Sequence, residues 1–122
     1  MKTVMVVDDS RIMRGIVKKT FDQLNIPVSY LEAGDGILAM KILAENKVDL
    51  ILLDWNIPGM SGIDFLKQIK TMEKYKNIPV IMITSEAAKL NIIEAVKAGA
   101  TAYVIKPIDD KIFMEKISKI SF

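Results

Sequence analysis

Short runs of apolar residues alternate along the chain with longer segments of mixed polarity. Three of these runs, at residues 4–7, 50–53 and 80–83, are rich in β-branched side chains and are bounded by Asp, Pro or Thr. Their continuous apolar character predicts strands that are buried on both faces of a sheet. The segments 28–32 and 101–105 are less apolar, so we predict that they form the two edge strands.

Between the predicted strands, apolar residues recur at spacings of three and four, which is typical of amphipathic helices. The first of these segments carries Ile12, Ile16 and Phe21, and the others cover residues 38–43, 63–69, 90–98 and 112–120. Gly99 follows the fourth segment and is typical of a helix C-terminus. No linker, repeat or low-complexity stretch interrupts the pattern, so we predict one domain over residues 1–122.

Alternating buried strands and amphipathic helices predict a doubly wound α/β fold with a five-stranded parallel sheet. With the first, third and fourth strands inside and the second and fifth at the edges, the strand order is 2-1-3-4-5. In this order the chain reverses direction between the first and third strands. Ligands bind at such a point, beyond the carboxyl ends of the strands, so the residues after positions 7 and 53 are candidates for a site.

The composition excludes several kinds of chemistry, because the 122 residues include no cysteine and no histidine. The chain cannot form a thiolate nucleophile, a Cys/His zinc site, a Ser-His-Asp triad or an imidazole general base. The net charge is +2 and the basic residues are dispersed, which does not indicate nucleic-acid binding. The first apolar run is too short for a signal peptide or a membrane span, so we expect a cytoplasmic protein without a membrane partner.

Three aspartates follow two of the buried strands directly. Asp8 and Asp9 come after the first strand and Asp54 after the third, so the predicted fold brings three carboxylates to one crevice. Each aspartate alone is compatible with helix capping or a solvated loop. Together, however, they repel one another unless a cation or a proton is bound, and Mg²⁺ is a cation that prefers such oxygen ligands.

Two further polar residues follow strands at the same edge of the predicted sheet. Thr84 follows the fourth strand, and Lys106 follows the fifth with Pro107 behind it. A hydroxyl and an ammonium beside a metal-bound carboxylate can cradle a phosphoryl group, whose transfer depends on positioning and charge neutralisation. The Lys106–Pro107 bond is also of the type that tolerates a cis peptide.

Taken together, these residues resemble the signature of the receiver domains of response regulators, which have a flavodoxin-like fold. The matching elements are Asp8-Asp9, Asp54 in the segment DWNIPGMSG, Thr84-Ser85-Glu86 and Lys106-Pro107. The resemblance covers nearly the whole chain. Asp54-Trp55-Asn56, the run EAAKLNIIEAVKAGA that starts at Glu86, and Tyr103 are most similar to the members that control chemotaxis.

The resemblance implies that Asp54 accepts a phosphoryl group from a phosphohistidine of a sensor histidine kinase. It also implies that Mg²⁺ is held by the side chains of Asp9 and Asp54 and the carbonyl of Asn56, with Asp8 acting through water. Thr84 and Lys106 would then hold the phosphoryl oxygens.

The resemblance also implies how phosphorylation is passed on to a partner protein. Phosphorylation would draw Thr84 toward the site and let the ring of Tyr103 swing inward, which changes a partner surface that includes Glu86. The implied target is a flagellar motor switch protein, and we expect the protein itself to be a monomer. A dedicated phosphatase and a role as a phosphorelay intermediate, passing phosphate to a histidine phosphotransfer protein, both stay open.

Two other functions are less compatible with the sequence. A Mg²⁺-dependent phosphohydrolase with an aspartate nucleophile normally has a second aspartate two residues later, where this chain has Asn56. A flavin or nucleotide carrier would need free backbone amides after the first strand, where Asp8 and Asp9 would instead repel a phosphate.

Overall fold

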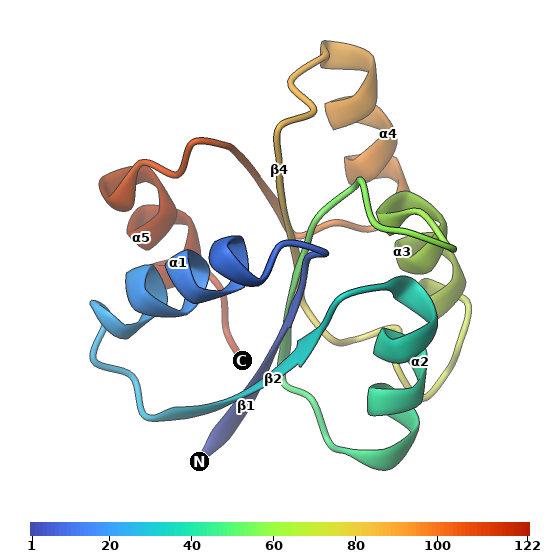
Figure 1. Ribbon diagram of the computed structural model, residues 1–122. Coiled ribbons are helices and arrows are strands. Elements are labelled where there is room, and N and C mark those ends of the chain that lie inside the picture. The colour runs from blue at the N-terminus through green and yellow to red at the C-terminus, as the bar shows by residue number, and fades with distance from the viewer.

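Strands and helices alternate along all 122 residues of the computed structural model (Figure 1). The strands are β1 (Lys2–Val7), β2 (Val28–Ala33), β3 (Leu50–Leu53), β4 (Val80–Thr84) and β5 (Ala102–Ile105). The helices are α1 (Arg11–Asp22), α2 (Gly36–Glu45), α3 (Gly62–Lys70), α4 (Lys89–Ala98) and α5 (Asp110–Ser118).

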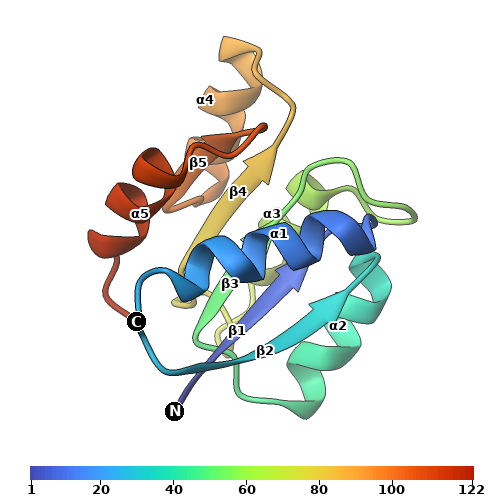
Figure 2. The ribbon, with the colours of Figure 1, turned by 60° about the vertical axis from the view of Figure 1, so that its left-hand side comes forward.

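The five strands form one parallel sheet in the order β2-β1-β3-β4-β5, which confirms the predicted fold (Figure 2). Val7 at the end of β1 pairs with Ala33 of β2 and with Leu53 of β3. Thr84 at the end of β4 pairs with Ile105 of β5. The carboxyl ends of the strands therefore lie at one edge of the sheet, and the loops that follow them can form a common site.

Helices cover both faces of the sheet, as the continuous apolar strands predict. Helices α1 and α5 lie on one face and α2, α3 and α4 on the other (Figure 1). Alternate residues of each central strand contribute to two separate cores. Of two neighbouring residues in β1, for example, Met5 packs under α2 and α3, whereas Val6 packs under α1 and α5. Burial on both faces leaves the central strands with little freedom to shift in register.

The observed elements differ from the predicted ones mainly at their ends and in the burial of some helical residues. Thr84 is the last residue of β4 rather than the first residue beyond it. Helix α1 buries Val17, Thr20 and Phe21 in its second half, whereas Ile12 in its first turn is 78% exposed. Leu90 at the start of α4 is 79% exposed. The apolar periodicity thus locates these helices correctly but overestimates how much of each one packs on the sheet.

Most of the helices begin at a side-chain cap that accepts a hydrogen bond from a backbone amide of the first turn. The capping residues of α1, α2, α3 and α5 are Ser10, Asp35, Ser61 and Asp109. Helix α4 differs, because its N-cap residue is Ala88, which has no side-chain acceptor. At its other end α4 is closed as predicted by Gly99, whose φ of 107° is in the left-handed region that favours glycine.

None of the helices has the length and apolar character that a membrane-spanning segment needs. The peptide bond between Lys106 and Pro107 is cis, the isomer that the sequence allowed at this position.

Candidate functional site

The three predicted aspartates converge beyond the ends of β1 and β3. The amide of Asp8 donates to the carbonyl of Ala33 at 3.0 Å, and the amide of Asp54 donates to the carbonyl of Val7 at 2.9 Å. These bonds continue the sheet pairing by one residue and fix both backbones. Carboxylate oxygens of Asp8, Asp9 and Asp54 all lie within 4.8 Å of one another. The sheet itself therefore creates the acidic cluster.

Lys106 supplies the positive charge for two of these carboxylates. Its Nζ atom lies 2.7 Å from Asp8 Oδ2 and 3.1 Å from Asp54 Oδ2. Burial alone would lower the pKa of Lys106, but the hydrogen bonds to Asp8 and Asp54 and their negative charges outweigh it, so that the pKa is raised. Lys106 is thus held protonated between the two buried aspartates.

Asp9 has a different environment from the other two aspartates. Asp8 and Asp54 are buried, whereas Asp9 is exposed and takes part in no ion pair with Lys106. The cluster therefore has one carboxylate open to solvent and two that share a single ammonium. Three carboxylates against one cation leave an excess of negative charge, and their hard oxygen atoms are the donors that Mg²⁺ prefers. The residues present fit a divalent cation of this kind.

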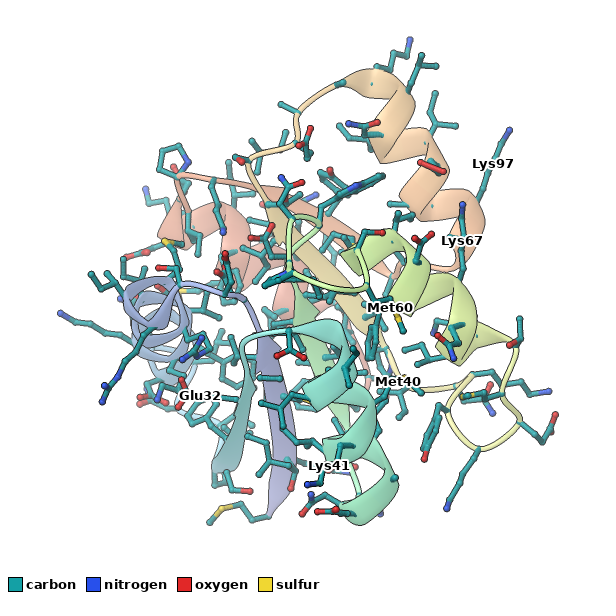
Figure 3. The ribbon with its side chains drawn as sticks, turned by 45° about the vertical axis from the view of Figure 1, so that its right-hand side comes forward. Glu32, Met40, Lys41, Met60, Lys67 and Lys97 are labelled. Atoms are coloured by element: carbon teal, nitrogen blue, oxygen red, sulfur yellow. The ribbon has the colours of Figure 1, made fainter.

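A second network holds the backbone of Asp8. Arg14 in α1 donates through Nη1 to the carbonyl of Asp8 at 2.6 Å and through Nε to Glu32 at 3.0 Å. Lys18 also binds Glu32, at 2.8 Å, where the edge strand β2 runs beside α1 (Figure 3). The hydrogen bond from Lys18, followed by that from Arg14, lowers the pKa of Glu32 despite its partial burial. The sequence pattern did not single out Arg14, because only the packing of α1 on the sheet brings it back to the end of β1.

The hydroxyl of Thr84 is buried and engaged with the loop that follows it. Thr84 is 0% exposed, and its Oγ1 atom accepts a hydrogen bond of 3.3 Å from the amide of Glu86. In this structure it therefore organises the β4–α4 loop rather than contacting a carboxylate. The prediction that Thr84 lies at the same edge of the sheet as the aspartates agrees with its position at the end of β4.

Tyr103 in β5 points into the protein rather than into solvent. It is 8% exposed, and its hydroxyl donates a hydrogen bond of 2.6 Å to the backbone carbonyl of Glu86. Burial raises the pKa of Tyr103, and the negative charges of Glu86 and Asp54 raise it further. The ring thus already occupies the inward position that the resemblance associates with phosphorylation, and the phenol is linked to the β4–α4 loop.

The Glu86 carboxylate joins three segments around the site. Its Oε1 atom accepts from Asn56 Nδ2 at 2.9 Å, and its Oε2 atom accepts from Asn91 Nδ2 at 3.2 Å. Asn56 belongs to the β3–α3 loop, two residues after Asp54, and Asn91 is in the first turn of α4. The sequence placed Glu86 and Asn56 at the site but did not single out Asn91, since its role depends on the direction of the β4–α4 loop.

The loop after Asp54 returns very close to its own start. The amide of Gly62 donates to the carbonyl of Trp55 at 2.8 Å, and α3 begins at this glycine. A Cβ atom at position 62 would lie 2.0 Å from the carbonyl oxygen of Asp54, which no side chain can tolerate. Gly62 is therefore required for the close approach that holds the backbone of Asp54.

All the residues predicted for the site are thus found around one edge of the sheet. Asp8, Asp9, Asp54 and Lys106 form its charged centre. Thr84, Asn56, Glu86 and Tyr103 form a hydrogen-bonded rim beside it. A set of this kind, with excess carboxylate charge, one fixed ammonium and a buried hydroxyl, can bind a hard cation together with a phosphoryl group.

Comparison with known proteins identifies this arrangement. The family model for the response regulator receiver domain matches residues 4–118 of the sequence. The chain therefore belongs to this family of two-component signalling domains. It is 41% identical to the Chemotaxis protein CheY of Pseudomonas aeruginosa over 117 aligned residues. The alignment covers 96% of this chain and 94% of that protein. It is 43% identical to the Chemotaxis protein CheY-3 of Vibrio cholerae, with 96% and 89% covered.

Solved structures of similar shape agree with the family assignment. The chemotaxis protein CheY4 of Vibrio cholerae superposes with a TM-score of 0.87 at 28% identity, covering 99% of both chains. The Mn²⁺-bound form of response regulator Rcp1 has a TM-score of 0.84 at 25% identity, covering 96% of this chain and 89% of that one. That relative therefore binds a divalent cation on the same fold.

Proposed function

We propose that this receiver domain accepts a phosphoryl group on Asp54 from a sensor histidine kinase, in a reaction that requires Mg²⁺. The observation that carries the proposal is the pair of ion contacts from Lys106 to Asp8 and Asp54, at 2.7 and 3.1 Å, within a cluster of three carboxylates. Structural stability does not require such a cluster, because the aspartates repel one another. It becomes favourable when a cation and a phosphoryl group share the site.

Each residue has a defined part in the proposed reaction. A carboxylate oxygen of Asp54 attacks phosphorus, the new O–P bond forms as the N–P bond of a phosphohistidine breaks, and the imidazole leaves with the bonding electron pair. Asp9, Asp54 and the carbonyl of Asn56 would hold Mg²⁺, with Asp8 acting through water. The ion supplies positive charge that neutralises the phosphoryl oxygens.

Lys106 and Thr84 would hold the product. The Lys106 ammonium already lies next to Asp54, so a small movement brings it onto a phosphoryl oxygen while its bond to Asp8 is kept. The Thr84 hydroxyl can turn from the amide of Glu86 toward the same group. Because Tyr103 bonds to the carbonyl of Glu86, this change would reach β5 and alter the surface that partners bind.

We further propose that the output controls chemotaxis, through a flagellar motor switch protein. The support is the set of relatives named chemotaxis proteins, at 41% and 43% identity over nearly the whole chain, together with Trp55, Asn56 and Tyr103. A phosphorelay role would use the same acceptor chemistry with a different partner. Asn56 argues against a phosphohydrolase, because an amide cannot transfer protons as an acid or base.

Labelling with radioactive acetyl phosphate tests the proposed chemistry. The wild-type protein should acquire acid-stable, base-labile label only with Mg²⁺ present, and Asp54→Asn should acquire none. Asp64→Asn is a matched control, since Asp64 is an exposed aspartate in the first turn of α3. Labelling of Asp54→Asn at the wild-type level would move the acceptor to another residue and overturn the proposal.

A pull-down distinguishes the two partner classes. The protein is immobilised with and without Mg²⁺ and beryllium fluoride, which mimics the phosphoryl group, and incubated with extract of its own cells. Recovery of a flagellar switch component only with beryllium fluoride supports chemotaxis. Recovery of a histidine phosphotransfer protein, and no switch component, would replace chemotaxis by a phosphorelay.

A further inference from the structure

The side-chain carboxylate of Glu86 bridges the acidic site and helix α4. One oxygen accepts from Asn56 at 2.9 Å and the other from Asn91 at 3.2 Å. The bond from Tyr103 goes instead to the backbone carbonyl of Glu86. Two different parts of Glu86 thus connect the site to two different elements, and the connection to α4 does not pass through Tyr103.

The first turn of α4 depends on this bridge because, unlike the other four helices, α4 has no side-chain cap at its N-terminus. Its N-cap residue is Ala88, and no side chain caps its first amides. Asn91 is the third residue of the helix, and its amide and that of Ile92 both donate to the carbonyl of Ala88. The side-chain bond from Asn91 to Glu86 therefore holds this turn where other helices have a cap, and it fastens the turn to the loop around the site.

We propose that Asn91 is a positioning residue that couples the occupancy of the acidic site to the first turn of α4, through Glu86 and Asn56. This inference rests on the function proposed above for the site. Asn56 has a double part in it, because its carbonyl is a proposed ligand of Mg²⁺ whereas its side-chain amide binds Glu86. A shift of Asn56 toward the site therefore weakens its bond to Glu86 and loosens the bridge to Asn91.

The type of bond suits such a role. Both amides donate to an ionised carboxylate, and charge-assisted hydrogen bonds are stronger than neutral ones. Both are also partly open to water, which lowers their net contribution to stability. A bond of this intermediate strength can be formed in one state of the site and weakened in the other, whereas a fully buried one would stay closed in both.

Hydrogen exchange at the amide of Ile92 tests the coupling directly. In the wild-type protein, Mg²⁺ with beryllium fluoride should speed this exchange about fivefold, since opening of the turn is limited by a hydrogen bond of modest strength. In Asn91→Ala the amide should exchange rapidly in both conditions, and the ratio of the two rates should approach one. If Asn91 only stabilised the helix, exchange in Asn91→Ala would be faster in both conditions but the fivefold ratio between them would be kept. That result would overturn the proposal.

Exchanging the amide of Asn91 and the carboxylate of Glu86 keeps the net charge and tests whether the response of the Ile92 amide can be rescued. Asn91→Asp places a carboxylate against Glu86 and should abolish the response. In the double variant Asn91→Asp with Glu86→Gln, the amide at position 86 can donate to the carboxylate at position 91. This variant should restore the wild-type ratio of the two exchange rates. Failure of the double variant to do so would contradict a direct bond as the basis of the coupling.

Two controls separate this inference from the proposed function. Asn46→Ala removes another asparagine whose amide caps a helix, through its bond to the carbonyl of Ile42, and should keep the wild-type ratio. Labelling of Asp54 by acetyl phosphate is measured in every variant. Loss of the ratio in Asn91→Ala with labelling retained supports the coupling. Absence of labelling in the wild-type protein would instead overturn the function proposed for the site.

Discussion

The phenol of Tyr103 donates a 2.6 Å hydrogen bond to the backbone carbonyl of Glu86, the residue whose amide donates to the hydroxyl of Thr84. Thr84 ends β4 next to the acidic cluster, and Tyr103 lies in the neighbouring edge strand β5. A single residue of the β4–α4 loop therefore connects the buried hydroxyl at the site with the aromatic ring beside α4. If Thr84 turns toward a phosphoryl group, as proposed above, it would give up its bond to the amide of Glu86, and the carbonyl of the same residue, which holds Tyr103 inward, would be free to move.

We predict that Tyr103 affects output without affecting the chemistry. In Tyr103→Ala, labelling of Asp54 should stay near the wild-type level, because the phenol bonds to the backbone carbonyl of Glu86 and not to a carboxylate of the charged centre. The gain in partner affinity on addition of Mg²⁺ and beryllium fluoride should fall by about 1 to 3 kcal/mol, the usual size of such a coupling. Tyr103→Phe keeps the ring but loses the bond to Glu86, so its gain should be intermediate. An unchanged gain in Tyr103→Ala would make the residue purely structural.

We predict a loss of stability at alkaline pH that depends on Lys106. The pKa of Lys106 is raised, so its contribution is fully present below the unfolded value of about 10.5 and is lost as pH rises through the higher folded value. Denaturant unfolding with a chelator present should therefore show a steep loss above this pH. Lys106→Met should lower the free energy of unfolding at pH 7 by about 2 kcal/mol, since Asp8 and Asp54 lose their cation.

The matched control for this pH effect is Lys119→Met. Lys119 forms an exposed pair with Glu115 at 3.2 Å, and exposed pairs contribute little. Its variant should keep the wild-type slope above pH 10.5 and the wild-type stability at pH 7. The same alkaline slope in Lys106→Met as in the wild-type protein would assign the loss to other groups.

The main parts of the site could be predicted from sequence because the sheet alone brings them together. Asp8, Asp54, Thr84 and Lys106 each lie at the end of a strand, and parallel strands of known order place those ends at one edge. Their spacing along the chain is then irrelevant. Once the order 2-1-3-4-5 is inferred from which strands are buried on both faces, the charged centre follows.

Other features depend on how helices rotate and pack, which periodicity does not specify. Arg14 reaches the carbonyl of Asp8 only because α1 rests on the sheet through its second half, which also leaves Ile12 exposed. Asn91 meets Glu86 only because the β4–α4 loop folds back toward the site. The inward position of Tyr103 was one of two that the sequence allowed, and the bond to Glu86 selects it.

We predict opposite effects on stability for the two adjacent aspartates. Asp9 is exposed and has no cation, so Asp9→Asn removes only repulsion and should raise the free energy of unfolding by about 0.5 kcal/mol in metal-free buffer. Asp8 is buried against Lys106, and Asp8→Asn should lower it by about 1 to 2 kcal/mol. Chemical denaturation of the two variants measures the difference. A loss of stability in Asp9→Asn would show that its charge is compensated.

We predict that Mg²⁺ changes the fluorescence of Trp55, the only tryptophan of the chain. Trp55 follows Asp54 directly and is half-buried against the core, so a charge change at the cluster alters its surroundings. A titration should show a saturable change that is lost in Asp9→Ala and kept in Asp64→Ala. If Asp9→Ala responds with the wild-type midpoint, Asp9 does not contribute to the metal site.

Finally, two glycines should respond in opposite ways to the same added methyl group. A Cβ atom at Gly62 would lie 2.0 Å from the carbonyl oxygen of Asp54, whereas one at Gly15 in the middle of α1 would meet nothing within 4 Å. Gly62→Ala must displace the backbone after Asp54, so we expect a loss of more than about 2 kcal/mol in unfolding free energy together with weaker labelling of Asp54. Gly15→Ala should gain about 0.5 to 1 kcal/mol, because alanine restricts the unfolded chain and favours the helix. Urea unfolding measures both values, and equal stability of the two variants would contradict the close approach at Gly62.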